Sequence, residues 1–394
     1  MKPIILVIGT RPEGIKMIPL YYALKRAKLP VLICSTNQHN NLLQEAFDLF
    51  SIKPDFELHC MVPGQDLFHI TQKVLEKIKE IFVSVEPSLV IVQGDTTTAM
   101  TAALAAFYLR IPLAHVEAGL RTPTIDLPFP EEMNRRFISM VAQLHFAPTA
   151  TAAANLLSEN IERQRVLCTG NTVVDALRIM EEKIKQEVVL IDATLKAVIE
   201  ENKKHGKKII LVTAHRRESF NGGIKSILTA IKTYAQKNPD TFFIYPYHPN
   251  PNVLQAIQSV GLDGTSNIFM CKPVAYKDLV YILLQADIVA SDSGGICEEA
   301  ASLGKPTLIL RNETERMEAV WEGVAHLVGT DEKNITDMLQ QIADTILLSE
   351  PKKRTIFGDG YAAEKMVQGI KNFFMHDNSN VLDHKKIKPT LVVK

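Results

Sequence analysis

The sequence predicts an α/β fold made of two Rossmann-like, doubly wound parallel-sheet domains that face a central cleft. Short, continuously apolar and β-rich runs alternate with longer helical patterns, which is typical of parallel strands covered by helices on both faces. The runs fall into two series with a charged helical stretch between them. A length of 394 residues is also sufficient for two domains.

Apolar runs place the strands of both domains. The first series is predicted at residues 4–8, 31–35, 89–93, 113–116 and 144–148. The second series is predicted at residues 209–213, 242–246, 288–291 and 307–311. We therefore predict an N-terminal domain over 1–168 and a C-terminal domain over 169–360, with a linker near 165–175. Residues 377–394 show no clear periodicity, and we expect this tail to be partly disordered.

The composition argues against several classes of function. Lysine plus arginine equals aspartate plus glutamate, with 44 of each, so no bulk charge favours nucleic acid or an anionic membrane as a partner. No apolar run is long enough to span a bilayer, and the first run is too short for a secretory signal. Five cysteines without metal-ligand or disulfide spacing indicate reduced thiols in a cytoplasmic protein without a metal site.

Charged residues and glycines follow most of the predicted strands. Ligands of open α/β sheets bind beyond the carboxyl ends of the strands, so these segments mark the expected site. They are GTRPEGIK (9–16), GDTTT (94–98), EAGLRT (117–122), AHRRE (214–218), YHPNP (247–251), DSGGICEE (292–299) and NETER (312–316). Together they predict a cleft between two domains that binds an anionic, polyhydroxylated ligand.

The segment SDSGGICEEA is the strongest indication of a phosphate site. Ser293, Gly294 and Gly295 connect a strand to a helix, where the backbone can approach a phosphate and free N–H groups can bind it. Glu299, in the first helical turn, suits either the helix dipole or the hydroxyls of a ribose. The first strand is not followed by GxGxxG, and the chain has no Walker lysine motif, which disfavours NAD and ATP.

Other residues at strand ends are candidates for proton transfer. Asp95 could cap the following helix or act in catalysis. Glu117 directly follows a buried strand, and His215 follows one in the second domain, so both are candidate acid/base groups. Weaker candidates of the same kind are His39 and His248. The predicted phosphate or sugar contacts after the first strand are Arg11 and Lys16.

The segment PFPEEMNRR is typical of a helix start. Pro130 suits the first turn, and two glutamates suit the positive end of the helix dipole. Glu131 with Arg135, and Glu132 with Arg136, have the i,i+4 spacing of stabilising ion pairs. On its own this segment predicts only a helix.

Seven ordered motifs together resemble a known family. They are GTRPEGIKM, QGDTTTA, HVEAGLRT, PFPEEMNRR, TAHRRESF, SDSGGICEEA and TERMEAV. From Gly9 to about Val320 the chain resembles the non-hydrolysing UDP-N-acetylglucosamine 2-epimerases. The resemblance implies the GT-B architecture, in which the last helix, here at about 361–376, packs back on the first domain. It also implies a homodimer, a UDP-sugar substrate and no cofactor.

The resemblance implies reversible epimerisation at C2 between UDP-N-acetylglucosamine and UDP-N-acetylmannosamine. Enzymes of this family expel UDP from C1 while C2 loses its proton, which gives 2-acetamidoglucal, and then add UDP back. The implied catalytic residues are Asp95, Glu117, Glu131 and His215. The implied substrate-binding residues are Arg11, Lys16, Arg135, Arg216, His248, Tyr276, Ser293, Gly294, Gly295, Glu299 and Arg316.

Within PFPEEMNRR the resemblance divides the two i,i+4 pairs. Glu131 and Arg135 are expected to face the cleft, where the arginine would lower the pKa of Glu131. Glu132 and Arg136 are expected to remain an exposed surface pair. Which carboxylate takes the proton and which returns it is left open.

Four positions depart from the usual family pattern. Gly14, Asn40, Cys297 and Met317 stand where Ala, Arg, Gln and Pro are common, which leaves open the exact sugar and the activation by substrate found in bacterial relatives. The alternatives are a 2-epimerase of a modified sugar such as UDP-2,3-diacetamido-hexuronate, a hydrolysing 2-epimerase, a GT-B glycosyltransferase and a non-catalytic nucleotide-sugar sensor. Cell-wall or capsule polysaccharide synthesis is the expected use of the product.

Overall fold

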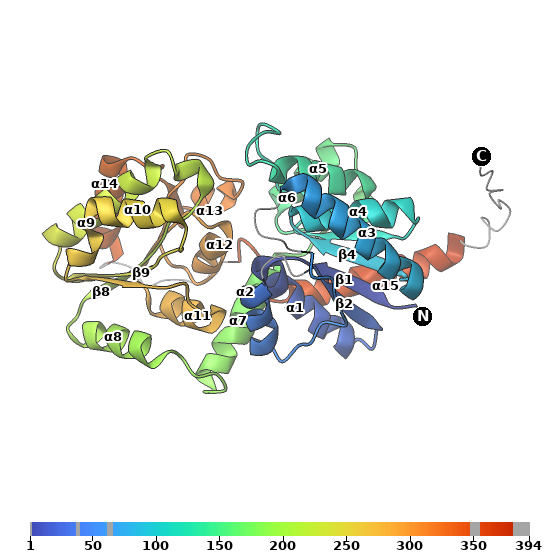
Figure 1. The fold of residues 1–394 in the computed structure, drawn as a ribbon, viewed down its shortest axis with the longest axis horizontal. Coiled ribbons are helices and arrows are strands. Elements are labelled where there is room, and N and C mark those ends of the chain that lie inside the picture. Colours follow the sequence, from blue (N-terminus) through green and yellow to red (C-terminus); the bar gives the residue numbers. More distant parts are fainter. Residues whose placement is uncertain (1, 37–39, 61–65, 347–354, 381–394) are drawn as a thin grey trace.

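Two separate sheets form the two lobes of the protein (Figure 1). The computed structural model describes residues 2–36, 40–60, 66–346 and 355–380. All strand pairs in both sheets are parallel. The predicted α/β class with two Rossmann-like domains is therefore confirmed.

The first sheet and its helices occupy the N-terminal part of the chain. Its strands are β1 (Ile4–Ile8), β2 (Val31–Ser35), β3 (Phe56–Glu57), β4 (Leu89–Gln93), β5 (Leu113–Val116), β6 (Leu144–Ala147) and β7 (Val166–Cys168). The helices between them are α1 (Arg11–Arg26), α2 (Asn40–Leu49), α3 (Leu67–Val85), α4 (Thr97–Tyr108), α5 (Glu131–Val141) and α6 (Ala150–Ser158). The strand order is β3-β2-β1-β4-β5-β6-β7.

The second sheet follows the same plan. Its strands are β8 (Lys208–Thr213), β9 (Thr241–Pro246), β10 (Ile268–Cys271), β11 (Ile288–Ser291), β12 (Thr307–Ile309) and β13 (Ala325–Leu327), in the order β10-β9-β8-β11-β12-β13. The helices of this half are α7 (Thr172–Lys185), α8 (Ala193–Lys204), α9 (Gly223–Lys237), α10 (Pro251–Val260), α11 (Tyr276–Gln285), α12 (Gly294–Ser302), α13 (Met317–Trp321) and α14 (Glu332–Ile346). The last helix of the chain is α15 (Ala362–Asn380).

The central strands are apolar along their whole length because both faces of each sheet are covered. In β1, Ile4, Leu6 and Ile8 belong to one hydrophobic cluster, whereas Ile5 and Val7 belong to another. Successive side chains of a strand point to opposite faces, so the two clusters lie on the two sides of the sheet. All five side chains are completely buried, which explains why the sequence shows no polar alternation.

Four short strands have no counterpart among the predicted runs. They are β3, β7, β10 and β13, which form the two edges of each sheet. Each has two to four residues and is only partly buried. The stretch predicted as a linker, 165–175, contains β7 and the start of α7.

Helix α7 connects the two lobes, and α15 packs beside it. Helix α7 packs against α1 and α15 on one side and against α11 and α12 on the other. The carboxylate of Asp175 in α7 accepts hydrogen bonds from the N–H groups of Ala362 (3.1 Å) and Ala363 (2.8 Å) at the start of α15. Gly369 of α15 lies against Phe146 of β6, so the last helix packs on the first lobe (Figure 1).

The chain is described to Asn380, the last residue of α15. Residues 377–380, predicted as part of the tail, continue α15, and residues 381–394 lie outside the described residues. Among the residues that the structure describes, no helix is both long and apolar enough to cross a bilayer.

The strand order reverses at one place in each sheet, between β1 and β4 in the first and between β8 and β11 in the second. Ligands of open α/β sheets bind at such switch points. The turns after β1 and β4 carry Arg11 and Asp95, and those after β8 and β11 carry His215 and Ser293. The fold therefore brings the predicted residues of each domain to the edge where a ligand is expected.

Candidate active site

Glu117 follows β5 and is buried between the two domains, with 6% of its surface exposed. One carboxylate oxygen accepts hydrogen bonds from Lys16 Nζ and Gln93 Nε2 of the first domain. The other accepts one from Arg316 Nη2 of the second domain at 2.9 Å. The backbone φ of Glu117 is 65°, a value that non-glycine residues rarely adopt. The predicted residues Glu117 and Lys16 therefore form an ion pair, in which Glu117 has a strained backbone and hydrogen-bond partners on both carboxylate oxygens.

Arg316 carries a contact between the domains. Its Nε donates to Glu298, its Nη1 to Glu315 at 2.5 Å and its Nη2 to Glu117. Burial lowers the pKa of an arginine, but these three carboxylates outweigh it and raise the pKa of Arg316 well above its usual value. Gly294 allows this approach, because a Cβ there would lie 2.5 Å from the guanidinium carbon. The arrangement favours a role in joining the domains over the predicted contact with phosphate or sugar.

Arg135 binds Asp95, so the predicted ion pair between Glu131 and Arg135 is wrong. Arg135 Nε and Nη2 lie 2.8 and 2.7 Å from Asp95 Oδ2. Its Nη1 donates to Glu132 at 3.1 Å, and its Nη2 lies 3.5 Å from Glu315 of the second domain. Burial lowers the pKa of Arg135, but the charges of Asp95 and Glu315 reverse this effect and raise it.

Glu132 is completely buried, so the expectation of an exposed surface pair is also wrong. Its Oε1 accepts from Arg136 Nε at 2.9 Å, and its Oε2 accepts from Arg135 and from the backbone N–H of Thr122. Glu132, Arg135 and Ser139 are all buried, and their spacing defines one face of a helix. The pattern of charges alone does not show that this face of α5 turns inward.

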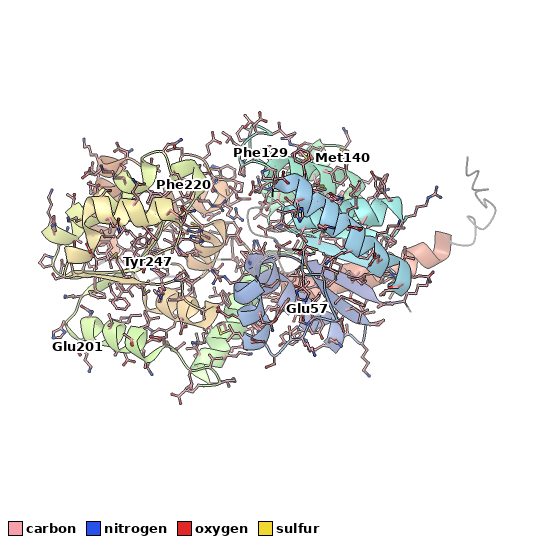
Figure 2. The ribbon with its side chains drawn as sticks, in the orientation of Figure 1. Glu57, Phe129, Met140, Glu201, Phe220 and Tyr247 are labelled. Atoms are coloured by element: carbon pink, nitrogen blue, oxygen red, sulfur yellow. The ribbon has the colours of Figure 1, made fainter. Side chains whose placement is uncertain are left out.

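Phe129 of the same motif is exposed, although it is apolar. Its side chain is 69% exposed on the loop that leads into α5 (Figure 2). Within PFPEEMNRR, the aromatic residue therefore faces outward and a charged residue faces inward. This reversal is possible because Glu132 has three donors for its two oxygens.

Glu131 lies beside this network without joining it. Its Oε2 is buried and has no hydrogen-bond partner in the described part of the chain. Burial, helped by the charge of Asp95, raises the pKa of Glu131, while the charges of Arg216 and Arg135 oppose the shift. Arg135 therefore acts in the expected direction, but burial outweighs it, so the predicted net lowering of the pKa of Glu131 is wrong. A buried carboxyl group with a raised pKa is suited to donating a proton.

Asp292 organises the turn that carries His215. Its carboxylate is buried and accepts the backbone N–H groups of His215 and Arg216. His215 Nδ1 lies 3.2 Å from Asp292 Oδ1, and its ring stacks on that of His248 with centroids 5.7 Å apart. Burial alone would raise the pKa of Asp292, but these contacts lower it. Asp292 directly follows β11 and begins the predicted strand-end segment DSGGICEE, but it was not among the predicted site residues.

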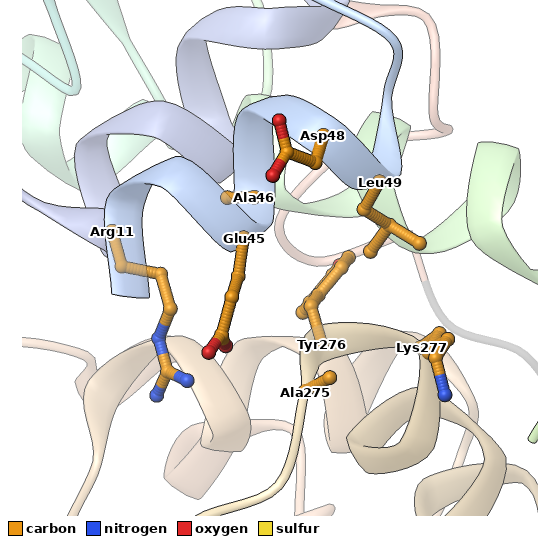
Figure 3. A pocket seen from close by; sticks show the side chains of 8 residues that line it. All are labelled: Arg11, Glu45, Ala46, Asp48, Leu49, Ala275, Tyr276 and Lys277. Atoms are coloured by element: carbon orange, nitrogen blue, oxygen red, sulfur yellow. The ribbon is translucent and has the colours of Figure 1, made fainter. Parts of the chain in front are cut away.

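A cavity of about 300 Å³ lies between α1 and α2 of the first domain and α11 of the second (Figure 3). Arg11 and Glu45 line it from the first domain, and Tyr276 lines it from the second. Arg11 also donates to the carbonyl of Val274 at 3.3 Å. The Tyr276 hydroxyl donates to Glu299 Oε1 at 2.7 Å, and burial raises the pKa of Glu299 to about 7. Three predicted binding residues are therefore neighbours here.

The start of α12 has the form of an anion site. The helix begins at Gly294, after Ser293, whose side chain makes no capping hydrogen bond. A Cβ on Gly295 would meet no atom within 4 Å, so the space beside Gly295 is open, whereas Arg316 lies against Gly294. Free N–H groups at such a terminus bind phosphate well.

Two further predictions concern a metal and a histidine. Within the described ranges, no group of three or more His, Cys, Asp or Glu side chains could hold a metal ion. His39, a weaker candidate for proton transfer, lies outside the described residues.

The arrangement combines two capacities. The first domain supplies the carboxyl groups of Asp95, Glu117 and Glu131, which differ in their ionic partners. Such differences allow one group to accept a proton while another donates one. The second domain supplies a helix start for an anion and an imidazole oriented by Asp292. The carboxyl groups of the first domain and the helix start of the second domain together suit acid–base chemistry beside a phosphate group that leaves.

Comparisons with known proteins agree on one family. The family model described as UDP-N-acetylglucosamine 2-epimerase matches residues 22–371. The UDP-N-acetylglucosamine 2-epimerase of Campylobacter jejuni is 44% identical over 371 residues, which cover 93% of this chain and 97% of that protein. The enzyme of the same name from Escherichia coli K12 is 41% identical over 377 residues, which cover 94% and 98%.

Solved structures give the same result. The UDP-GlcNAc 2-epimerase of Neisseria meningitidis bound to UDP-GlcNAc superposes with a TM-score of 0.87 and 41% identity, covering 94% of this chain and 100% of that one. The S. aureus MnaA–UDP structure superposes with a TM-score of 0.86 and 35% identity over 100% of both chains. A sucrose-phosphate synthase from Thermosynechococcus elongatus, at 15% identity and a TM-score of 0.64, shares the fold alone.

We predict that Glu132→Gln lowers the free energy of unfolding by about 3 kcal/mol, because it weakens a buried ion pair and leaves an N–H group poorly bonded. The matched control is the adjacent Glu131→Gln, which should change stability by no more than about 0.5 kcal/mol. Urea unfolding followed by circular dichroism measures both variants. Equal stability of the two variants would contradict the inward orientation of Glu132.

Proposed function

The chain belongs to the UDP-N-acetylglucosamine 2-epimerase family, and we propose that it interconverts UDP-N-acetylglucosamine and UDP-N-acetylmannosamine without releasing a free sugar. The observation that supports this proposal is that Asp95, Glu117 and Glu131 lie close to a helix start of the other domain whose first N–H groups are suited to an anion. A module that only binds a nucleotide sugar would not need three buried or half-buried carboxyl groups at one place.

The proposed reaction is an elimination followed by an addition. A base removes the proton from C2, the C1–O bond to UDP breaks, and a double bond forms between C1 and C2 of 2-acetamidoglucal. UDP then adds back to C1, and an acid delivers a proton to the opposite face of C2. No hydride is transferred, so the proposed reaction requires no nicotinamide. It requires acid–base groups at C2 and stabilisation of the diphosphate as it leaves.

The first domain is proposed to act at the sugar. Glu131, whose pKa is raised by burial, would donate or accept a proton at C2. Asp95 would act on the other face, and Arg135 would stabilise its negative charge. Glu117, joined to Lys16, would stabilise positive charge that develops at C1 of the sugar.

The second domain is proposed to hold UDP. The N–H groups at Ser293, Gly294 and Gly295 would bind the diphosphate. His215, oriented by Asp292, would stabilise it as it leaves, with help from Arg216. Further proposed contacts to the nucleotide or sugar are Arg11, Lys16, His248, Tyr276 and Glu299.

Further proposals concern the setting of the enzyme. We expect an N-terminal domain over 1–168, a C-terminal domain over 169–360, a homodimer and a cytoplasmic location. Light scattering tests the dimer, because a monomeric mass would refute it. The product would serve cell-wall or capsule polysaccharide synthesis.

The function is tested by incubating the protein with UDP-N-acetylglucosamine in D₂O and following the reaction by NMR. We expect UDP-N-acetylmannosamine to appear, with deuterium at C2 of both epimers, because C2 exchanges its proton during each turnover. Free N-acetylmannosamine with UDP would instead indicate a hydrolysing enzyme. Absence of any turnover would contradict the substrate and favour a modified UDP sugar, a glycosyltransferase or a sensor.

We predict that Glu131→Gln lowers kcat at least about 100-fold, the usual loss when a general acid or base is removed. The matched control is Glu322→Gln, an exposed glutamate that should leave kcat unchanged. In the direction in which Glu131 delivers the proton to C2, the proposed reaction starts with Glu131 protonated, a state that its raised pKa favours. In that direction kcat/KM should be full below this pKa and fall as pH rises through it.

The pH profile also identifies the group. The residual activity of Glu131→Gln should lack the fall at high pH, since the amide does not titrate. An unchanged profile in the variant, or a kcat equal to that of the control, would contradict the role of Glu131.

A further inference from the structure

Glu13 is a buried carboxylate that the proposed reaction leaves without a role. It lies in the first turn of α1 and is 1% exposed, so it cannot touch a ligand in the cleft. Its Oε2 accepts hydrogen bonds from Thr10 Oγ1 at 2.7 Å and from the N–H of Gly9 at 3.2 Å. Its Oε1 accepts one from Thr96 Oγ1 at 2.8 Å. Burial raises the pKa of Glu13 to about 7.

A capping box accounts for only half of these contacts. In that motif a glutamate at the third helical position bonds back to the backbone before its own helix, as Glu13 Oε2 does with Gly9. Such a glutamate normally lies at the helix surface. Here the second oxygen crosses to Thr96, the N-cap residue of α4, which follows a different strand. Glu13 therefore ties the turn after β1 to the turn after β4.

The turn after β4 carries Asp95, and its backbone is fixed at two further atoms. The carbonyl of Gly94 lies 2.7 Å from Nε2 of the buried His115. The carbonyl of Asp95 accepts from Asn134 Nδ2 at 2.8 Å. Gly94 has a φ of 70°, which a glycine adopts without cost, so the turn has little local stiffness of its own. Its position depends on contacts from other elements.

Thr96 completes this support from the other side. Its Oγ1 accepts the N–H of Ala99 in α4 and donates to Glu13. Without the acceptor on Glu13, the hydroxyl would be a buried or half-buried donor without a partner, which is costly. The Asp95 carboxylate itself keeps 27% of its side chain exposed. The backbone of the turn is thus fixed while the reacting group remains accessible.

We propose that Glu13 is a positioning residue, which holds Asp95 at the reacting carbon by fixing Thr96 against the start of α1. The inference rests on the proposed function, since it gives Asp95 a part in proton transfer at C2. A misplacement of about 1 Å at a reacting group can lower the rate about 100-fold. The proposed diphosphate contacts lie on the other domain, and Thr96→Val leaves α1 with Arg11 and Lys16 unchanged, so weaker positioning in this variant should lower kcat and leave KM nearly unchanged.

The test compares Glu13→Ala and Thr96→Val, singly and together, with Thr96→Ser. We expect each single variant to lower kcat about 10- to 100-fold, and Thr96→Val, which leaves the start of α1 unchanged, to keep KM within about 3-fold of the wild type. Thr96→Ser keeps the hydroxyl and should keep kcat within about 3-fold. The double variant should be no worse than the worse single one, because both remove the same bond. If Glu13→Ala does not fold, the comparison of Thr96→Val with Thr96→Ser carries the test.

The matched control is Thr101→Val in the same helix. The Thr101 hydroxyl is also buried and donates to the carbonyl of Thr97, but it does not touch the Asp95 turn, so kcat should not change. Wild-type kcat in both Thr96→Val and Glu13→Ala, or additive losses in the double variant, would overturn the positioning role alone. Absence of turnover in the wild-type chain would overturn the proposed function and this inference with it.

Discussion

The guanidinium of Arg316 is the interaction on which the arrangement of the two domains depends. It is buried and donates to Glu117 of the first domain and to Glu298 and Glu315 of the second. Two buried ions of opposite charge compensate each other only when their geometry is good. Removing one partner leaves a charge in a poorly solvated place, which typically costs about 3–5 kcal/mol. The contact therefore holds the domains in a defined relative position.

The same contact extends into a continuous chain of charges. Lys16 meets Glu117, Glu117 meets Arg316, and Arg316 meets Glu315. Glu315 in turn faces Arg135, which binds Asp95. Two of the three proposed catalytic carboxylates are thus part of one network that crosses the cleft, whereas Glu131 is outside it. Burial raises the pKa of Glu131, and a carboxyl group of this kind is suited to donating a proton in acid–base catalysis.

The strands that could be predicted from the sequence are those whose side chains are buried on both faces of the sheet. Strands such as β1 and β8 are buried on both faces and appear as apolar runs. The four edge strands β3, β7, β10 and β13 were not predicted, because each is short and partly exposed and so gives no continuous apolar run. Site positions were predictable because they follow central strands. The ionic partners of these residues were not predictable from the sequence. The i,i+4 spacing pairs Arg135 with Glu131, but Arg135 binds Asp95, which is forty positions away.

Amide hydrogen exchange in Glu117→Gln tests the account most directly. The substitution removes the charge that the first domain offers to Arg316. We predict that amides of residues 315–320, in the other domain, exchange at least about tenfold faster, as expected if the contact contributes more than about 1.4 kcal/mol to local stability. Exchange in β9 should stay unchanged. Faster exchange confined to the first domain would show that Arg316 does not couple the two domains through Glu117, and would contradict the central claim.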